Sequence, residues 1–323
     1  MANNVHLQNK CLDVTVRIPE GKPVSQRFDA AAVVEQVVLN RTHRFCVPEQ
    51  YDEKRVTTYG QGLSSEFTDR YSTEAKPGEQ FPKMGVGLFT QQEGDGRLNK
   101  WISYEVTPWQ RSYTVGKNYV EFAQKPKKCL GIALRILRRV SIHANTLTIT
   151  TTVENVGERT YQGSEYQHNF LAIDDIPIGG GYRLQLPYDK EIGNIMTRGK
   201  AHAKNDGFRE LDERGVPGKL VDNPVEVEGD CIVWKDSMDR KTFHKITRAD
   251  GIRTMGEYKW TLSCDGSPAK VSEVHHFAPS NFSIWGVEHC VCTEVHHAFT
   301  VEPGEKHTYA RTWIFEDDTT QDL

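Results

Sequence analysis

Short runs of β-branched and aromatic residues recur along the whole chain and constrain its fold more than any other feature. Examples are LDVTVRI, NYVEFA, TLTITTTV, YKWTLSC and NFSIW, and turn-forming stretches such as NVGER, CDGS and EPGEKH separate such runs. In TLTITTTV and HTYARTWIF the side chains alternate with the two-residue period of a strand that has two distinct faces. No convincing series of strands and amphipathic helices alternates along the chain, which argues against a parallel α/β fold. The segment AAAVVEQVVL fits a helix or a strand, and periodicity alone does not decide between them.

The runs predict an all-β fold, a large antiparallel β-sandwich in which two extensive sheets pack face to face. The 323 residues contain no fixed-period repeat, low-complexity tract or clear linker. The polar stretch over residues 198–219 resembles a long loop more than a hinge, and such loops often carry function. We therefore expect residues 1–323 to form a single domain.

Charge and cysteine content exclude several classes of protein. A formal net charge of −4 argues against binding to nucleic acid or to an anionic membrane, because both require a clustered basic surface. The one basic run, LRILRR at Leu134–Arg139, is expected to be the solvent face of a strand. The absence of a signal-peptide pattern and of a bilayer-spanning segment predicts a cytoplasmic protein. Seven cysteines without a CxxC pair are typical of reduced thiols.

Histidine is the residue type that most suggests chemistry. His168 lies in QHNFLAI, which has the pattern of a short buried strand. Burying an imidazole without hydrogen-bond partners costs free energy, and the group titrates near neutral pH, so His168 is either a satisfied core residue or a proton-transfer group.

A second strand, HCVCTEVHHAF, carries a carboxylate and three more histidines, His289, His296 and His297. Alternation places two sets of side chains on opposite faces: Cys290, Cys292, Glu294 and His296 on one, and Val291, Thr293, Val295 and His297 on the other. Taken alone, this segment favours the interpretation of Glu294 as an exposed glutamate on a solvent face. The chain has two adjacent histidine pairs, His275–His276 and His296–His297. Adjacent histidines on a strand point to opposite faces and do not readily bind one ion, so we expect no metal site from these pairs.

Two segments far apart in the chain together resemble one protein family, the aldose 1-epimerases or galactose mutarotase-like proteins. The stretch NTLTITTTVENVGERTYQGSEYQHNFLAI is similar to the family passage in which a strand and an asparagine–glycine turn lead to a strand with a histidine followed by an aromatic residue. The stretch CVCTEVHHAFTVEPGEKHTYARTWIF resembles the family's closing Cys-x-Glu strand, Pro-Gly-Glu turn and final strand. With the weaker GEQFPKMGVGLFT, the resemblance covers Gly62 to Phe315 and implies the family's β-supersandwich.

The resemblance implies that His168 and Glu294 are the catalytic residues. In the family's reaction the glutamate takes the proton of the anomeric hydroxyl and the histidine gives a proton to the ring oxygen; the ring opens, the C1 carbonyl turns over, and the ring closes as the other anomer. Positioned proton transfer of this kind contributes about a hundred- to ten-thousandfold in rate. The resemblance implies no cofactor and no metal, and a monosaccharide or sugar derivative as the partner.

One family feature is missing, namely an earlier histidine in a His-Gly-Gly context that supports the substrate near its ring oxygen. Lys83 in GEQFPKMGVGLFT is the nearest residue that could donate to a sugar oxygen, and Glu66 in GLSSEF could bind sugar hydroxyls. Trp285 is a candidate for stacking against the sugar ring. His276 is a further candidate for substrate contact.

The sequence therefore predicts an aldose 1-epimerase-like isomerase of carbohydrate metabolism. A non-catalytic carbohydrate-binding or sensing protein is the alternative that the missing histidine favours. A lyase or hydrolase that acts on a sugar derivative is a second alternative, since fold alone does not exclude it.

Overall fold

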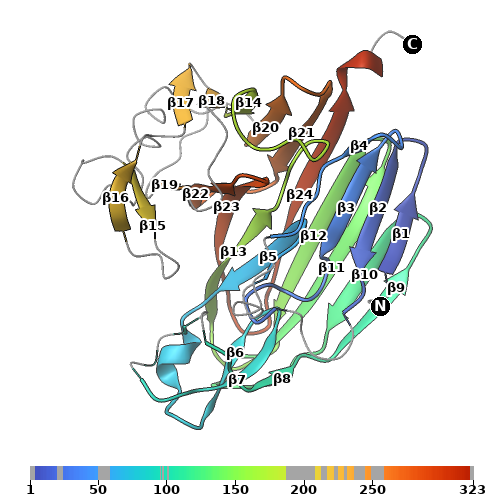
Figure 1. Ribbon diagram of the computed structural model, residues 1–323. Coiled ribbons are helices and arrows are strands. Elements are labelled where there is room, and N and C mark those ends of the chain that lie inside the picture. Colours follow the sequence, from blue (N-terminus) through green and yellow to red (C-terminus); the bar gives the residue numbers. More distant parts are fainter. Residues whose placement is uncertain are drawn as a thin grey trace.

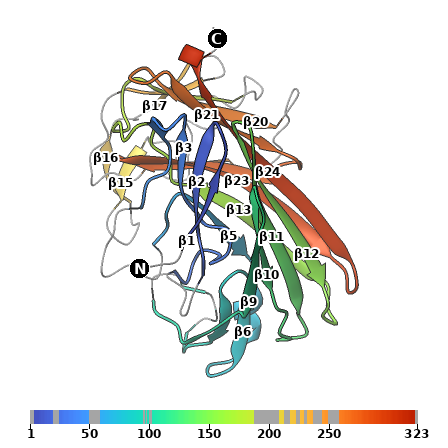
Figure 2. The same ribbon diagram turned by 90° about the vertical axis from the view of Figure 1, so that its right-hand side faces the viewer.

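Two large antiparallel β-sheets packed face to face make up most of the protein, as Figures 1 and 2 show in two views. This computed structural model describes residues 4–19, 25–49, 59–94, 96, 98–99, 102–186, 208–211, 217–221, 225–228, 231–235, 244–248 and 258–320. In these ranges the helical segments are the short 3₁₀-helices η2 (Tyr71–Glu74) and η4 (Asp318–Thr320). The same ranges contain no helix of the length and apolar character that a bilayer crossing requires. The predicted all-β antiparallel sandwich is confirmed.

The first sheet contains the strands on which His168 and Glu294 lie. Its strand order is β1 (Asn4–Gln8), β2 (Leu12–Arg17), β3 (Val34–Leu39), β5 (Leu63–Thr68), β13 (Tyr161–Asn169), β23 (Cys290–Val301), β22 (Asn281–Val287) and β19 (His244–Arg248), with β4 (His43–Arg44) beside β3. Segments from both ends of the chain thus meet in its centre, where β13 lies between β5 and β23.

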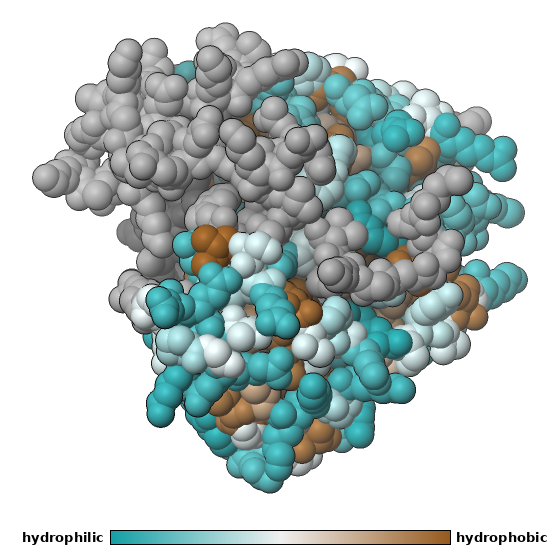
Figure 3. All heavy atoms as spheres, turned by 60° about the horizontal axis from the view of Figure 1, so that its bottom comes forward, coloured by the Kyte–Doolittle hydropathy of each residue, from teal (hydrophilic) through white to brown (hydrophobic). Residues whose placement is uncertain are grey.

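The second sheet covers one face of the first. Its strand order is β17 (Val225–Glu228), β18 (Cys231–Trp234), β14 (Tyr182–Gln185), β20 (Lys259–Cys264), β21 (Ala269–His275), β24 (Lys306–Asp317), β12 (Thr146–Asn155), β11 (Leu134–His143), β10 (Tyr119–Gln124) and β9 (Arg111–Val115). Two smaller sheets complete the fold: β6 (Gln80–Lys83) with β7 (Gly87–Thr90) and β8 (Val106–Pro108), and β15 (Phe208–Leu211) with β16 (Pro217–Val221). Figure 3 shows the end that carries β6–β8 as mainly hydrophilic, with small scattered hydrophobic areas.

Alternating burial explains how these strands build a core. In β12, Leu147, Ile149, Thr151 and Val153 are buried between the sheets, and Thr146, Thr148, Thr150 and Thr152 are more exposed. Burying each of the aliphatic side chains contributes about 1.5 to 3 kcal/mol. The segment AAAVVEQVVL, which the sequence left open, contains strand β3. All seven cysteines are free thiols, as expected.

Two expectations about polar stretches have different outcomes. The run LRILRR is a strand with Arg135 and Arg139 exposed, but Arg138 is buried, so the prediction of a purely solvated face is wrong for that residue. Arg138 tolerates burial because its guanidinium pairs with Asp29 at 3.1 Å and with Glu165 at 3.5 Å. Of the polar stretch 198–219, residues 208–211 and 217–219 lie in the β15–β16 hairpin and the others lie outside the described residues.

Candidate functional site

His168 and Glu294 meet because of strand register. Strand β13 pairs with β23 in antiparallel fashion, and the register places His168 directly opposite Glu294. Side chains that face each other across neighbouring strands lie on the same side of the sheet, close enough to touch. His168 Nε2 lies 3.1 Å from Glu294 Oε1, and the two side chains are 3% and 4% exposed. The sheet therefore brings together two residues that are far apart in the sequence.

The next strand fixes the orientation of the carboxylate. Strand β22 pairs with the other side of β23 and places Ser283 opposite Glu294. The Ser283 hydroxyl donates a hydrogen bond of 2.5 Å to Glu294 Oε2. Each carboxylate oxygen thus has its own neighbour, a hydroxyl on one side and an imidazole on the other.

Aromatic rings surround the imidazole of His168. Phe170 stacks on it with ring centroids 4.1 Å apart, while Phe28 and Trp285 approach it edge-on, each at 5.5 Å. Gly60 makes room for this arrangement, since a Cβ atom there would lie 2.3 Å from the Phe170 ring and 2.7 Å from the Phe28 ring. The rings limit rotation of His168, and one of them is Trp285, the residue predicted as a candidate for stacking against a sugar ring.

A second polar group lies beside the pair on the same face of the sheet. In the register of β5 with β13, Ser64 is opposite His168 and Glu66 is opposite Tyr166. Arg27 bridges these residues: its Nε lies 2.6 Å from Glu66 Oε2, and its Nη2 donates to the Tyr166 hydroxyl at 2.7 Å. Tyr166 in turn donates to Glu66. Glu66 is therefore held by two partners one step along the strands from the catalytic candidates.

Arg27 is a site residue that the sequence analysis missed. Burial opposes its charged form, yet Tyr166, Glu66 and Glu294 outweigh burial and raise the pKa of Arg27 well above its usual value. Its guanidinium also lies 4.6 Å from the centre of the Phe28 ring, a cation–π contact. Among the described residues, Nε and Nη2 are the guanidinium nitrogens of Arg27 that make hydrogen bonds. A single arginine in a loop gives no periodic signal that could have identified it.

The predicted substrate residues have different positions. Lys83 Nζ lies 3.6 Å from Glu66 Oε1 and donates to the backbone carbonyl of Phe67, and its side chain is 3% exposed. Lys83 thus contacts both Glu66 and the backbone of β5 beside it. His276 is exposed and its Nε2 lies 3.0 Å from Thr312 Oγ1, on the side of the second sheet that faces away from the first. The structure brings Lys83, Glu66 and Trp285 to the catalytic candidates and does not bring His276 there.

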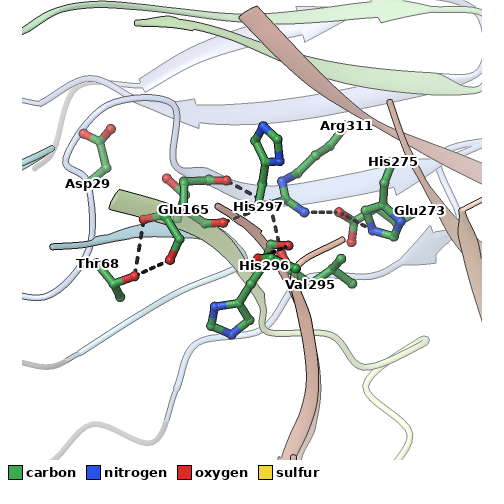
Figure 4. Close-up of polar contacts among 12 residues, drawn as sticks. Asp29, Thr68, Glu165, Glu273, His275, Val295, His296, His297 and Arg311 are labelled. Atoms are coloured by element: carbon green, nitrogen blue, oxygen red, sulfur yellow. Dashed lines mark hydrogen bonds and ion pairs between the residues drawn. The ribbon is translucent and has the colours of Figure 1, made fainter. Parts of the chain in front are cut away.

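His296 is the nearby member of the other histidine pair. Its ring stacks on Tyr166 with centroids 4.5 Å apart, whereas His297 points to the opposite side of β23, as Figure 4 shows. This confirms the predicted alternation along β23. Across the described ranges, no group of three or more His, Cys, Asp or Glu side chains is arranged to hold a metal ion.

An open pocket of about 600 Å³ continues the same face of the sheet. Thr68 and Ser164 line this pocket. Thr68 is the next residue on the same face of β5 after Glu66, and Ser164 is the next residue on the same face of β13 beyond Tyr166. Ala298 follows His296 on β23 in the same way. The face that carries His168 and Glu294 therefore leads into a polar concavity.

Comparison with known proteins gives structural neighbours only. No protein-family model matches the sequence, and no curated protein does. A protein from Escherichia coli K12 provisionally assigned as an aldose 1-epimerase has a TM-score of 0.57 and 13% identity, with 98% of this chain and 100% of that chain covered. A galactose mutarotase-like protein from Lactobacillus casei has a TM-score of 0.55 and 12% identity, over 97% and 100% of the chains.

A third neighbour extends the likeness to an animal protein. The aldose epimerase homologue from C. elegans has a TM-score of 0.53 and 9% identity, over 98% and 99% of the chains. At such identities the likeness establishes the fold alone. The chain has the galactose mutarotase-like fold.

Proposed function

We propose that the protein is an aldose 1-epimerase-like isomerase that interconverts the anomers of a monosaccharide or sugar derivative. The observation that carries this proposal is the 3.1 Å contact between His168 Nε2 and Glu294 Oε1 on one face of the sheet. A carboxylate and an imidazole so placed are an acid–base pair of the kind that ring opening requires, and the fold is one in which this chemistry is expected from the sequence resemblance.

Glu294 is the proposed base and His168 the proposed acid. Glu294 Oε1 takes the proton of the anomeric hydroxyl while His168 Nε2 gives a proton to the ring oxygen, and the ring opens. After the C1 carbonyl has turned over, the two transfers run in reverse and close the other anomer. Ser283 holds Oε2, so the carboxylate keeps Oε1 directed toward His168. In the free protein the two residues contact each other; an entering sugar replaces that contact with one hydrogen bond to each.

The neighbouring residues are proposed to bind the sugar. Trp285, beside the His168 ring, presents an apolar surface for the sugar ring, and Arg27 Nη1 donates to a sugar oxygen. Glu66 accepts from sugar hydroxyls and Lys83 holds Glu66 in place. Proton shuttling between a carboxylate and an imidazole needs no cofactor or metal.

The test is anomer exchange in Glu294→Gln and His168→Asn, measured by polarimetry or NMR over neutral, acidic and phosphorylated hexoses. Each variant keeps hydrogen-bonding capacity but cannot shuttle the proton, so we expect exchange to slow by about a hundredfold or more with nearly unchanged sugar affinity. The double variant should be scarcely slower than the slower single variant, because the two residues act as one unit. Glu154→Gln, at a partly exposed surface glutamate paired with Arg135, is the matched control.

Unchanged exchange in both single variants would refute the acid–base pair. A carbohydrate-binding protein without catalysis is the second candidate, and one observation favours it: Lys83, the nearest replacement for the family's earlier histidine, is buried and already bonded to the protein. A wild-type protein that binds a sugar but never exceeds the spontaneous exchange rate on this panel would establish that alternative.

A further inference from the structure

The side of β13 opposite to His168 points into the space between the two sheets. Asn169, the residue after His168, is fully buried there. Its Nδ2 donates to two acceptors, the backbone carbonyl of Thr293 at 2.8 Å and the Glu273 carboxylate at 2.8 Å. Thr293 immediately precedes Glu294. Asn169 therefore connects the strand of the proposed acid to the backbone beside the proposed base.

Arg311 on β24 makes the corresponding contact on the other side of Glu294. Its Nη2 donates to the backbone carbonyl of Val295 at 2.9 Å and to the Glu165 carboxylate at 2.9 Å. Its Nη1 donates to Glu273 at 3.1 Å. Figure 4 shows Arg311 between Glu165 and Glu273, behind the β23 backbone. The carbonyls of the residues immediately before and after Glu294 are thus both held by buried side chains.

Glu273 on β21, in the second sheet, anchors both of these side chains. Besides Asn169 and Arg311, it accepts a hydrogen bond from Trp260 Nε1 at 3.0 Å and lies 3.2 Å from His275 Nε2. Burial raises the pKa of the Glu273 carboxyl, but His275, Arg311 and Asn169 outweigh burial and leave it below its usual value. Glu273 is therefore an ionised, fully bonded acceptor at neutral pH.

We propose that Asn169 and Arg311 are positioning residues that hold the β23 backbone so that Glu294 stays opposite His168, with Glu273 as their anchor in the second sheet. The geometric requirement is strict, since a displacement of about 1 Å at a reacting group costs on the order of a hundredfold in rate. The kinetic part of this proposal rests on the proposed function, whereas the positioning itself does not.

The structure offers a matched pair of variants, Asn169→Ala and Asn155→Ala. Asn155 is also fully buried, and its Nδ2 also donates to a β23 carbonyl, that of Val301 at 2.8 Å, and to the Arg159 carbonyl at 2.7 Å. Of these two asparagines, only Asn169 holds the carbonyl of a residue next to Glu294. Both variants lose two buried donated hydrogen bonds, and Asn155→Ala also loses the bond that Asn155 Oδ1 accepts from the Gly157 N–H at 2.9 Å. A role in stability alone therefore predicts an effect of Asn155→Ala at least as large as that of Asn169→Ala.

The first measurement separates kcat from KM for anomer exchange, normalised to folded protein. We expect Asn169→Ala to lower kcat by about ten- to a hundredfold with KM within about threefold, because the sugar still binds while proton transfer is misaligned. Asn155→Ala should keep kcat within about twofold at a comparable shift of the urea midpoint. Equal kcat losses in the two variants would overturn the proposal.

The second measurement does not need activity. In ¹⁵N-labelled protein, the His168 ring resonances report its contact with Glu294, and Glu294→Gln provides the spectrum of the lost contact. Asn169→Ala should move the His168 signals toward that spectrum, and Asn155→Ala should leave them at the wild-type positions. His168 signals unchanged in Asn169→Ala would overturn the positioning role. A wild-type protein without anomer exchange would instead remove the proposed function and leave this comparison valid.

Arg311→Lys provides the test if Asn169→Ala does not fold. Lysine keeps the charge but cannot reach Val295, Glu165 and Glu273 with the planar fork of a guanidinium. It should therefore show the same loss of kcat and the same movement of the His168 signals. Wild-type kcat and spectra in Arg311→Lys would contradict the proposal.

Discussion

Glu165 is the middle member of a buried chain of alternating charges. Neutralising it tests how much these buried ion pairs contribute to the free energy of unfolding. The chain runs through five side chains, all largely buried: Asp29, Arg138, Glu165, Arg311 and Glu273. Glu165 lies 3.5 Å from the Arg138 guanidinium and 2.9 Å from that of Arg311. Glu165→Gln keeps the shape of the side chain and removes the negative charge between the two cations.

The expected cost follows from what each arginine retains. Removing one partner of a buried ion pair typically costs about 3 to 5 kcal/mol, because an uncompensated charge remains. Here Arg138 keeps Asp29 and Arg311 keeps Glu273, and the new amide oxygen still accepts one hydrogen bond. We therefore expect the lower end, about 3 kcal/mol. With an unfolding slope of about 3 kcal/mol per molar urea, the midpoint falls by about 1 M.

Equilibrium urea unfolding, followed by tryptophan fluorescence, measures this shift, and the buried Trp260 and Trp313 report on the core. The control is Glu154→Gln, which neutralises a partly exposed surface glutamate beside Arg135 and should leave the urea midpoint nearly unchanged, because surface ion pairs contribute little to stability. A Glu165→Gln midpoint that coincides with that of Glu154→Gln would show that the buried charges do not act as described.

Two further predictions concern other parts of the molecule. His297 lies 2.8 Å from His307, and burial together with His307 lowers the pKa of His297 to about 4. The unfolded state therefore binds more protons between about pH 6.5 and pH 4, and stability falls as the pH drops through this window. His297→Phe should flatten the dependence of the urea midpoint on pH there, and an unchanged slope would contradict the assignment. Trp285→Ala should weaken sugar affinity by about tenfold, or about 1.4 kcal/mol, and Trp285→Phe by less. Calorimetric titration measures both, and equal affinities of wild type and Trp285→Ala would remove Trp285 from the sugar site.

The two-residue alternation of apolar and polar side chains is the main sequence signal that predicts the β-sandwich. In β12 the alternation of Leu147, Ile149 and Val153 with threonines identified both the strand and its buried face. The same signal was present around Arg138, which shares a face with Leu134, Ile136 and Val140 in LRILRR and beyond. The general tendency of charged residues to be solvated predicts the opposite position for Arg138. The period was the better guide, because ion partners from the other sheet make the burial of Arg138 possible.

The candidate site was only partly predictable for a different reason. Alternation placed Glu294 and His296 on one face of β23, and the family resemblance singled out His168. Which strand lies next to which depends on long-range pairing, and nothing in the local sequence of β13 or β23 specifies their register. Arg27 lies in a loop without periodicity, so its contacts with Glu66 and Tyr166 could be recognised only in the structure.

Strand β13 connects the proposed sugar site to the buried charges, because its two faces carry different groups. Tyr166 and His168 face the proposed sugar site, while Glu165 and Asn169 face the buried charges. Buried ion pairs seldom make a protein more stable than apolar residues would, since well-packed apolar residues of similar volume often give equal or greater stability. The contacts of Arg311 and Asn169 with the carbonyls beside Glu294 give these charges a use that apolar residues cannot supply, because only donors can hold a backbone carbonyl. An apolar replacement of the whole chain of charges would then keep the sandwich folded and lose the alignment of Glu294 with His168.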